Sequence, residues 1–438
     1  MATAPKFSCV LVLGCCLFPF SALAGEKPVS NWTGWHGGIG AGYGMLDHTL
    51  SGAVDAGGGP FTFAGSGKLT GIAGEGGLLS AEFGYDQVIG NGILLGATAD
   101  YTRSSISTDL NFDPVVGQLQ ASDAISLLVR GGRIINDNTV LYSLAGWTHT
   151  RMEGDASAAG LFAGSYNYAT NGLTLGGGVE TAIADNWTLK FEHRITYNGR
   201  KTLLDDDLDL GGFGTANLVV GERVHEQTAR IVLSYRPGIV APQFSGEDLW
   251  TGFRVGGAAG YGMVNHVIAS PASPDSFSGL GGEGFLGSVE AGYDQLVGER
   301  LVLGAQADYT YSDISTKLSA TDGTDSISFK AQPTHNVSLL ARAGVLTSPD
   351  VMFYGIGGWT HSRFDLGFSI TGDPPLNEHH SLNGLTLGGG AEVQLNDRWS
   401  WKAEYRYTDY EDWDALDLGA VKLQNNIQSV RTTLAYHL

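Results

Sequence analysis

Acidic and basic side chains recur at every second position in two related segments. The segment KFEHRITY at 190–197 carries Lys190, Glu192 and Arg194, with apolar or aromatic residues between most of them. A matching segment, KAEYRYTD, occupies 402–409. A spacing of two places these ions on one face of a β-strand. Such an array can neutralise itself through ion pairs, or it can supply general acids and bases to a reaction.

The same alternation over the rest of the chain gives each half one polar face with four acids and four bases. In the first half these residues are Glu82, Asp100, Arg130, Glu180, Lys190, Glu192, Arg194 and Arg230. In the second half they are Glu290, Asp308, Arg342, Glu392, Lys402, Glu404, Arg406 and Arg431. Unpaired buried charge is costly, so a narrow interior needs such a balance. Both halves carry the set and no nucleophile accompanies it, so we expect a structural ion network and no catalytic residues.

The two halves are copies of one design. NGLTLGGGVE at 171–180 returns as NGLTLGGGAE at 383–392, and GYDQVIG at 84–90 returns as GYDQLVG at 292–298. The repeating unit is therefore about two hundred residues long, which is the size of a domain and too long for a solenoid repeat.

The start of the chain has the pattern of an export signal. An apolar stretch from Phe7 to Phe20 is followed by Ala22 and Ala24, which fit an A-x-A cleavage site. We expect a signal peptide at 1–24, and the alternative is lipoprotein processing before Cys15. All three cysteines lie in this segment, so the mature chain would be held by its backbone ladder and core without disulfides.

The remaining chain alternates polar and apolar residues, and no run reaches the roughly 18 apolar residues of a membrane helix. Each repeat contains eight alternating segments, joined in turn by short turns and by long connections such as 103–122 and 198–224. This rhythm, with an even number of strands of about 10 residues, is typical of bacterial outer-membrane barrels. We predict an all-β fold, a transmembrane antiparallel up-and-down β-barrel. A soluble β-sandwich would instead turn its charges outward.

Aromatic residues near the ends of the predicted strands favour a girdle at the membrane interface. They include Trp32, Trp35 and Trp250. Trp147 and Trp359 are predicted to serve packing instead.

Charge balance within each repeat favours two tandem eight-stranded barrels, at 25–236 and 249–438, joined by a linker at 237–248. Pro237 and Pro242 would interrupt a strand in that linker. One sixteen-stranded barrel, in which the same segment is a periplasmic turn, stays open as the alternative. Its water-filled lumen would not demand neutrality.

Three stretches resemble the outer-membrane immunogenic proteins of Rhizobiales. They are the Trp-Thr-Gly start of 250–261, NGLTLGGG followed by Glu, and DNWTLKFEHRITY at 185–197. Each copy is similar to one whole member of this family. The resemblance implies an eight-stranded, porin-like or structural barrel in the Gram-negative outer membrane, with haemin binding or antigenicity credited to some members. Members are usually single barrels that end in an aromatic residue, whereas this chain ends in Leu438.

The net charge of −20 argues against nucleic acid as a partner. The acidic stretch Asp205–Asp209 lacks the central Gly and the closing Glu of a calcium loop, and His379 with His380 lacks further ligands. We therefore expect no metal and no cofactor. The expected partners are outer-membrane lipids, lipopolysaccharide and the barrel assembly machinery, together with an unidentified extracellular ligand.

Three classes of function fit these features. The first is a structural or porin-like barrel that contributes to envelope integrity and small-solute diffusion. The second is a surface binding protein that uses its long loops for adhesion or haemin capture. The third is a lipid-modifying enzyme, which the replacement of outward-facing His193 by Tyr405 in the second repeat disfavours.

Overall fold

The computed structural model describes residues 32–57, 63–112, 115–158, 162–209, 215–244, 248–269, 276–322, 324–414 and 422–438. The predicted signal peptide lies outside the described residues, as does the 245–247 part of the predicted linker. Among the described residues, no helix has the length and apolar character needed to cross a membrane.

The described residues of the first repeat form nine strands, which occupy eight positions in the sheet. The strands are β1 (Gly34–Gly57), β2 (Phe63–Ile89), β3 (Ile93–Phe112), β4 (Val115–Asn136), β5 (Thr139–Ala158), β6 (Phe162–Ala184), β7 (Trp187–Asn198), β8 (Lys201–Asp209) and β9 (Thr215–Tyr235). Because β7 and β8 both pair with β9, they occupy one place in the sheet.

The described part of the second repeat forms ten strands with the same order of pairing. They are β10 (Gly252–Ala269), β11 (Ser276–Val297), β12 (Leu301–Ser312), β13 (Thr316–Thr321), β14 (Ser326–Ser348), β15 (Val351–Ile370), β16 (Leu376–Gln394), β17 (Trp399–Tyr410), β18 (Trp413–Asp414) and β19 (Lys422–His437). Here β12 and β13 share the place beside β14, and β17 and β18 share the place beside β19.

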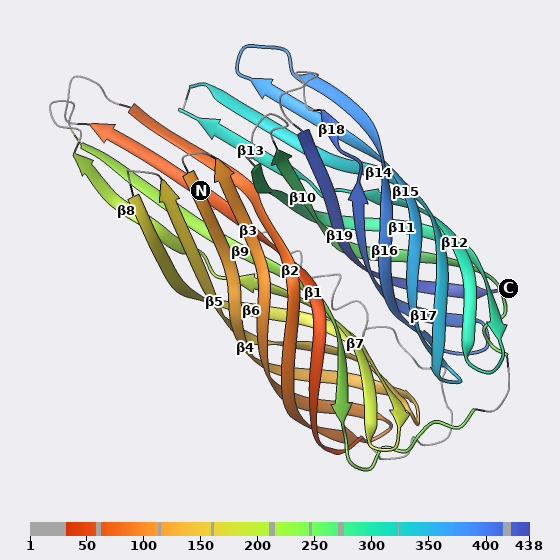
Figure 1. Ribbon diagram of the computed structural model, residues 1–438. Coiled ribbons are helices and arrows are strands. Elements are labelled where there is room, and N and C mark those ends of the chain that lie inside the picture. Colours follow the sequence, from red (N-terminus) through yellow and green to blue (C-terminus); the bar gives the residue numbers. More distant parts are fainter. Residues whose placement is uncertain are drawn as a thin grey trace.

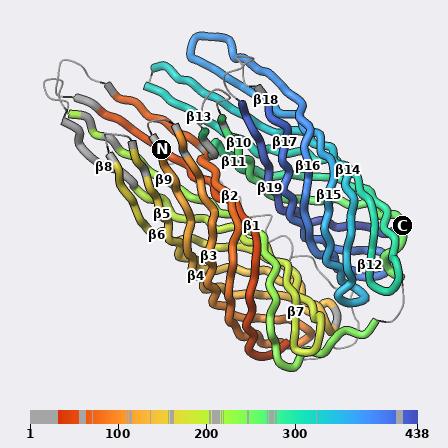
Figure 2. The backbone as a smooth tube through the Cα atoms, viewed as in Figure 1, coloured from red at the N-terminus to blue at the C-terminus, as the bar shows by residue number. Residues whose placement is uncertain are grey.

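Each repeat pairs its last strand with its own first strand. The ladder between β9 and β1 runs from Tyr235 opposite Gly37 to Thr215 opposite Gly57. The ladder between β19 and β10 runs from His437 opposite Arg254 to Lys422 opposite Ala269. We call β1 to β9 the first ring and β10 to β19 the second ring, and the two lie side by side (Figures 1 and 2). Short ladders join β2 and β3 to β11, and β2 to β13, across the rings.

All described strand pairs are antiparallel, so the prediction of an all-β antiparallel barrel fold is confirmed. The strands are longer than predicted: β1 has 24 residues and β2 has 27. The stretches at 103–122 and 198–224, which were expected to be loops, are largely strand. A hairpin can continue past the point where apolar alternation ends, because the ladder satisfies its backbone groups whatever the side chains are.

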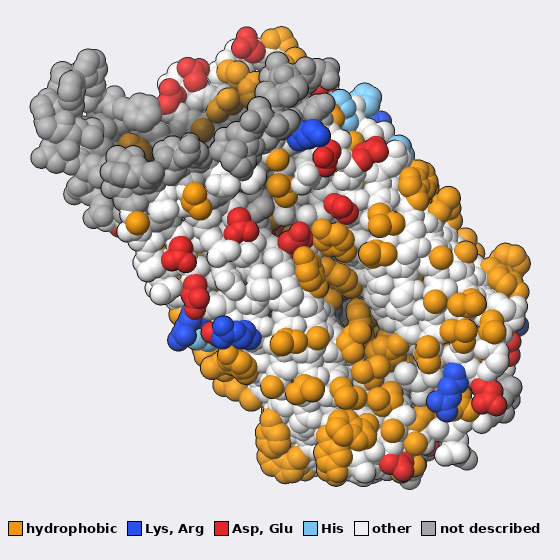
Figure 3. Space-filling view, in the orientation of Figure 1, with side chains coloured by type: hydrophobic (Ala, Val, Ile, Leu, Met, Phe, Trp, Pro, Cys, Tyr) orange, Lys and Arg blue, Asp and Glu red, His pale blue; other side chains and the backbone are white. Residues whose placement is uncertain are grey.

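The burial pattern is the reverse of that in a soluble protein. On β4, Leu127 and Val129 are 56% and 64% exposed, whereas Ser126 and Arg130 on the opposite face are buried. Hydrophobic side chains accordingly cover the lower outer surface and gather along the line between the rings (Figure 3). An outward apolar band around a polar interior is what a lipid-facing barrel requires.

Aromatic clusters lie at the end of each ring where short turns join the strands, which we call the short-turn end. Trp35 stacks on Phe83 at a centroid distance of 5.2 Å, and Trp399 meets Tyr436 at 5.0 Å. The expectation for Trp32 and Trp250 was wrong, because both are buried and donate Nε1–H to carbonyl oxygens, of Asp137 and Pro349 respectively. They lie at that end of each ring without joining the girdle.

The packing prediction for Trp147 and Trp359 was also wrong. These side chains are 44% and 43% exposed on the outer face. Each stacks on the histidine two residues further along its strand, His149 or His361, at 5.9 and 5.8 Å. Their strands did not indicate from sequence which face was apolar.

Candidate functional site: the ionic interior of each ring

The alternating ions of β7 and β17 point into the two rings. Lys190, Glu192 and Arg194 are buried in the first ring, while Phe191 and His193 between them face outward. All sixteen predicted network residues are buried, and none is more than 8% exposed. Strand pleating alone produces this separation, because successive side chains leave opposite faces of the sheet.

At the short-turn end of the first ring, Arg130 bridges two acids. Its Nε donates to Asp86 Oδ1 at 2.8 Å, and its Nη1 donates to Glu180 Oε2 at 2.8 Å. Arg236 reaches the same aspartate, with Nη2 donating to Asp86 Oδ2 at 2.5 Å. Asp86 lies on β2 and Glu180 on β6, so the Arg130 contacts cross the interior of the ring.

The middle of the first ring is filled by a second group of ions. Lys190 bonds to Glu82, and Arg194 donates to Asp100 at 2.8 Å and to Glu192 at 2.5 Å. The free lone pairs of Glu192 are also used, because the Tyr142 hydroxyl donates to it at 2.7 Å. Bonds to several partners per acid are what makes buried ions tolerable in a dry interior.

The second ring repeats most of these contacts between equivalent residues, although not always through the same atoms. Arg342 donates to Asp294 at 2.7 Å and also bonds to Glu392, and Lys402 bonds to Glu290. Arg406 donates to Asp308 at 2.8 Å and to Glu404 at 2.5 Å. The Tyr354 hydroxyl donates to Glu404 at 2.9 Å. The first ring pairs Arg230 with Asp100 at 3.4 Å, and the second ring pairs Arg431 with Asp308 at 3.3 Å. The structure therefore brings the members of each predicted set together within their own ring.

Sequence reasoning missed four members of the network. Asp86 and Asp294, in the GYDQ motifs, and the guanidinium groups of Arg236 and Arg254 are all buried with ionic partners. With them this network counts five acids and five bases in each ring. The signal was available, since Asp86 continues the every-second-residue series of Glu82 on β2 and Arg236 continues that of Arg230 on β9.

A row of hydroxyl groups lies beyond the ions in each ring. In the first ring it runs through Ser126, Thr148, Thr174 and Thr196, with oxygen to oxygen distances of 2.9, 2.5 and 2.8 Å. The second ring has Ser338, Thr360, Thr386 and Thr408, at 3.0, 2.5 and 2.8 Å. Each row crosses four neighbouring strands and leaves its hydroxyls bonded to one another.

Glycines allow neighbouring strands to approach closely on the inner face. A β-carbon at Gly42 would lie 2.2 Å from the carbonyl oxygen of Ala229, and one at Gly178 would lie 2.2 Å from that of Phe191. Neither contact is possible for a real side chain. These glycines therefore permit an approach of neighbouring strands that a residue with a side chain would prevent.

The residues singled out for metal or lipid chemistry lie elsewhere. Within the described ranges, no group of three His, Cys, Asp or Glu residues has a geometry that could hold a metal ion. The His380 ring lies 4.1 Å from that of Trp413. His193 faces out of the first ring as expected, but it is only 9% exposed because the second ring covers it.

These features define an outer-membrane β-barrel: an antiparallel closed ladder, an apolar exterior, aromatic clusters at a strand-end boundary and a polar, ion-paired interior. Residues 237–431 match the family model described as outer membrane protein beta-barrel domain.

Two relatives match part of the chain. This chain is 32% identical over 202 residues to the 31 kDa outer-membrane immunogenic protein of Brucella melitensis, and the match covers 43% of this chain and 83% of that protein. It is 29% identical over 184 residues to the 22 kDa outer membrane protein of Rhizobium leguminosarum, covering 42% of this chain and 75% of that protein. The chain belongs to this family of outer-membrane β-barrel proteins and is located in the Gram-negative outer membrane.

Among solved structures, Neisserial surface protein A is similar over 43% of this chain and 98% of its own length, at 18% identity and a TM-score of 0.27. The resemblance to the immunogenic proteins noted from sequence is confirmed by the two relatives.

Proposed function

We propose that this protein is a structural component of the outer membrane, inserted as two adjacent eight-stranded barrels whose interiors are closed by ions. The return of β9 to β1 and of β19 to β10 supports two separate closures. Each closed ladder leaves no unpaired strand edge toward lipid, as insertion demands.

The observation that carries the proposal is the bridge made by Arg130 between Asp86 and Glu180. It joins β2 to β6 through the interior, and Arg342 makes the equivalent bridge between Asp294 and Glu392. An interior of eight strands is just filled by side chains, and breaking a buried pair leaves an uncompensated charge. Envelope integrity therefore fits the geometry better than diffusion of solutes through the interior.

Conductance in a planar bilayer tests this function directly. The purified protein should produce no stable channel events, because ion bridges block both interiors. The variant Arg130→Ala with Glu180→Ala and Asp86→Ala, which empties the bridge, serves as a comparison for a widened interior. Large, stable channels from the unaltered protein would overturn the proposal and favour one wide pore.

Surface binding is a second candidate. It is favoured by the strand extensions at the end of each ring opposite the short turns. Residues 49–57 of β1 and the facing part of β2 continue the ladder well beyond the ion network. At the same end of the second ring, His380 and Trp413 place an imidazole beside an indole. Haemin titration of outer-membrane vesicles with and without His379→Ala and His380→Ala would test capture, and unchanged binding would exclude these two residues from it.

A further inference from the structure

The outward faces of the two rings meet along a seam. Its apolar part joins Phe191 and Val179 of the first ring to Trp401 and Val393 of the second in one buried cluster. A second cluster joins Met45 and Ile195 of the first ring to Tyr261 and Met263 of the second. Hydrophobic side chains line this seam between the rings in the space-filling view (Figure 3).

The polar contacts across the seam are reciprocal. Glu75 and Glu283 are equivalent residues, because each precedes its GYDQ motif by nine positions. Glu75 of the first ring accepts hydrogen bonds from Asn426 Nδ2 at 3.2 Å and Gln428 Nε2 at 2.6 Å of the second ring. Glu283 of the second ring lies 2.7 Å from His225 Nδ1 of the first ring.

His225 and Asn426 are themselves equivalent, since each lies five positions before the last interior arginine of its ring, Arg230 or Arg431. The glutamate of each ring thus contacts the corresponding position of the other ring. Contacts that exchange in this way define an isologous interface, the kind found in twofold dimers.

One pair of residues marks the axis. Ile72 of β2 lies opposite Leu280 of β11 in an antiparallel bridge. Both residues precede GYDQ by twelve positions, so they are each other's equivalents. A residue that meets its own counterpart lies at the twofold axis of an isologous contact.

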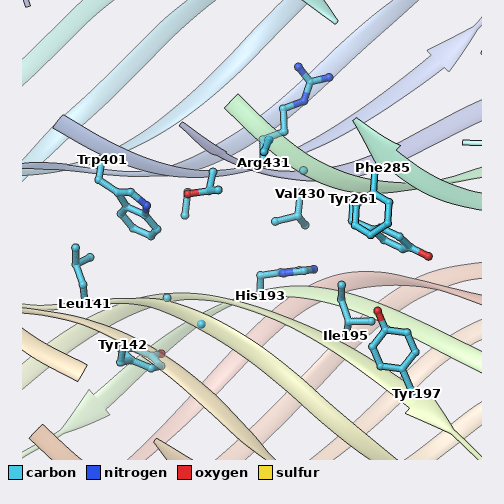
Figure 4. A pocket seen from close by; sticks show the side chains of 16 residues that line it. Leu141, Tyr142, His193, Ile195, Tyr197, Tyr261, Phe285, Trp401, Val430 and Arg431 are labelled. Atoms are coloured by element: carbon cyan, nitrogen blue, oxygen red, sulfur yellow. The ribbon is translucent and has the colours of Figure 1, made fainter. Parts of the chain in front are cut away.

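Two apolar cavities flank the axis and are lined by equivalent residues. The first is bordered by Ala259, Tyr261 and His193, and His193 points into the space between the rings (Figure 4). The second is bordered by the counterparts of these residues, Ala41, Tyr43 and Tyr405. The repetition extends the twofold relationship beyond the contact between Ile72 and Leu280.

We propose that the two rings form an isologous dimer within one chain. The seam surface of each ring therefore fits a second ring of the same kind. This rests on the proposed pair of separate barrels. The covalent link holds the two surfaces at high effective concentration, which favours their pairing.

Engineered cysteines test the pairing in the intact protein, because all three native cysteines lie in the predicted signal peptide. Directly opposed residues of antiparallel strands have Cα atoms about 4.5 to 5.5 Å apart, within the roughly 4.4 to 6.8 Å that a disulfide needs. Ile72→Cys with Leu280→Cys should therefore give, in isolated outer membranes, a disulfide that shifts gel mobility and is lost on reduction. Leu280→Cys with Val129→Cys, a lipid-facing position on β4, is the matched control and should not crosslink.

Reciprocity is tested by two further pairs, Glu75→Cys with Asn426→Cys and Glu283→Cys with His225→Cys, treated with a short thiol crosslinker. Both should crosslink in most of the population; crosslinking of only one pair would overturn the isologous arrangement. Ile39→Cys with Leu233→Cys, which face each other across the β1 to β9 ladder, reports closure of the first ring separately. Closure without any seam crosslink would refute the dimer and leave the proposed function standing, whereas loss of the closure crosslink would refute the proposed function itself.

Discussion

Arg254 of β10 lies directly opposite His437 of β19, and in the first ring the same two residue types occupy these positions in reverse. His36 stands where Arg254 does, four residues after the tryptophan of the Trp-Thr-Gly motif, and Arg236 follows β9 where His437 ends β19. Arg254 donates to Asp294 at 2.8 Å, and Arg236 donates to the equivalent Asp86 at 2.5 Å. The fifth base of the first ring therefore comes from the end of its last strand, and the fifth base of the second ring comes from its first strand.

This exchange predicts a compensating pair of substitutions. His36→Arg alone places a sixth base against five acids and should lower the free energy of unfolding by about 3 to 5 kcal/mol, the usual cost of an uncompensated buried charge. His36→Arg combined with Arg236→His reproduces the arrangement of the second ring, and most of the loss should be recovered. Urea unfolding in detergent micelles measures both. If the double variant is no better than the sum of its single changes, the two positions do not substitute for each other.

Removal of the central bridge should be costly in the interior and cheap on the surface. Arg130→Ala leaves Asp86 and Glu180 short of a partner and should cost about 3 to 5 kcal/mol. Arg103, whose side chain is 73% exposed and 3.6 Å from Asp123, is the matched control. Arg103→Ala should cost less than about 1 kcal/mol. Similar small losses for both arginines would mean that the interior of the first ring is wet.

Equivalent hydroxyls should matter equally in the two rings. Tyr142→Phe and Tyr354→Phe each remove a donor to a buried carboxylate, Glu192 or Glu404. We expect each to lower stability by about 1 to 3 kcal/mol, the cost of leaving a buried charged acceptor partly unsatisfied. Thermal unfolding followed by circular dichroism would show it. A loss in one ring only would indicate that the two interiors differ in hydration.

Each repeat should fold without the other. Residues 25–236 and 249–438, expressed separately and refolded in detergent, should each migrate faster on a gel before boiling than after it. A closed ladder resists detergent because it exposes no unpaired edge. Half of a sixteen-stranded barrel would keep two open edges and would aggregate, so aggregation of both halves would exclude separate barrels.

The sequence by itself determined which face of each alternating strand carries the interior ions. Period-two alternation is a property of the strand, so Lys190, Glu192 and Arg194 were assigned to one face without any knowledge of their partners. Internal repetition then fixed the matching set in the second ring. The residues that were missed, Asp86 and Arg236 among them, lie where a strand meets a turn or ends, and there the alternation was not carried through.

The tertiary structure alone decided which strand β9 pairs with. A ladder from β9 to β10 would satisfy the same backbone hydrogen bonds as the observed ladder from β9 to β1, and nothing local distinguishes them. It also decided what the outward face of β7 meets. Alternation turns His193 away from the ions, but only the position of the second ring covers that side chain with protein instead of lipid.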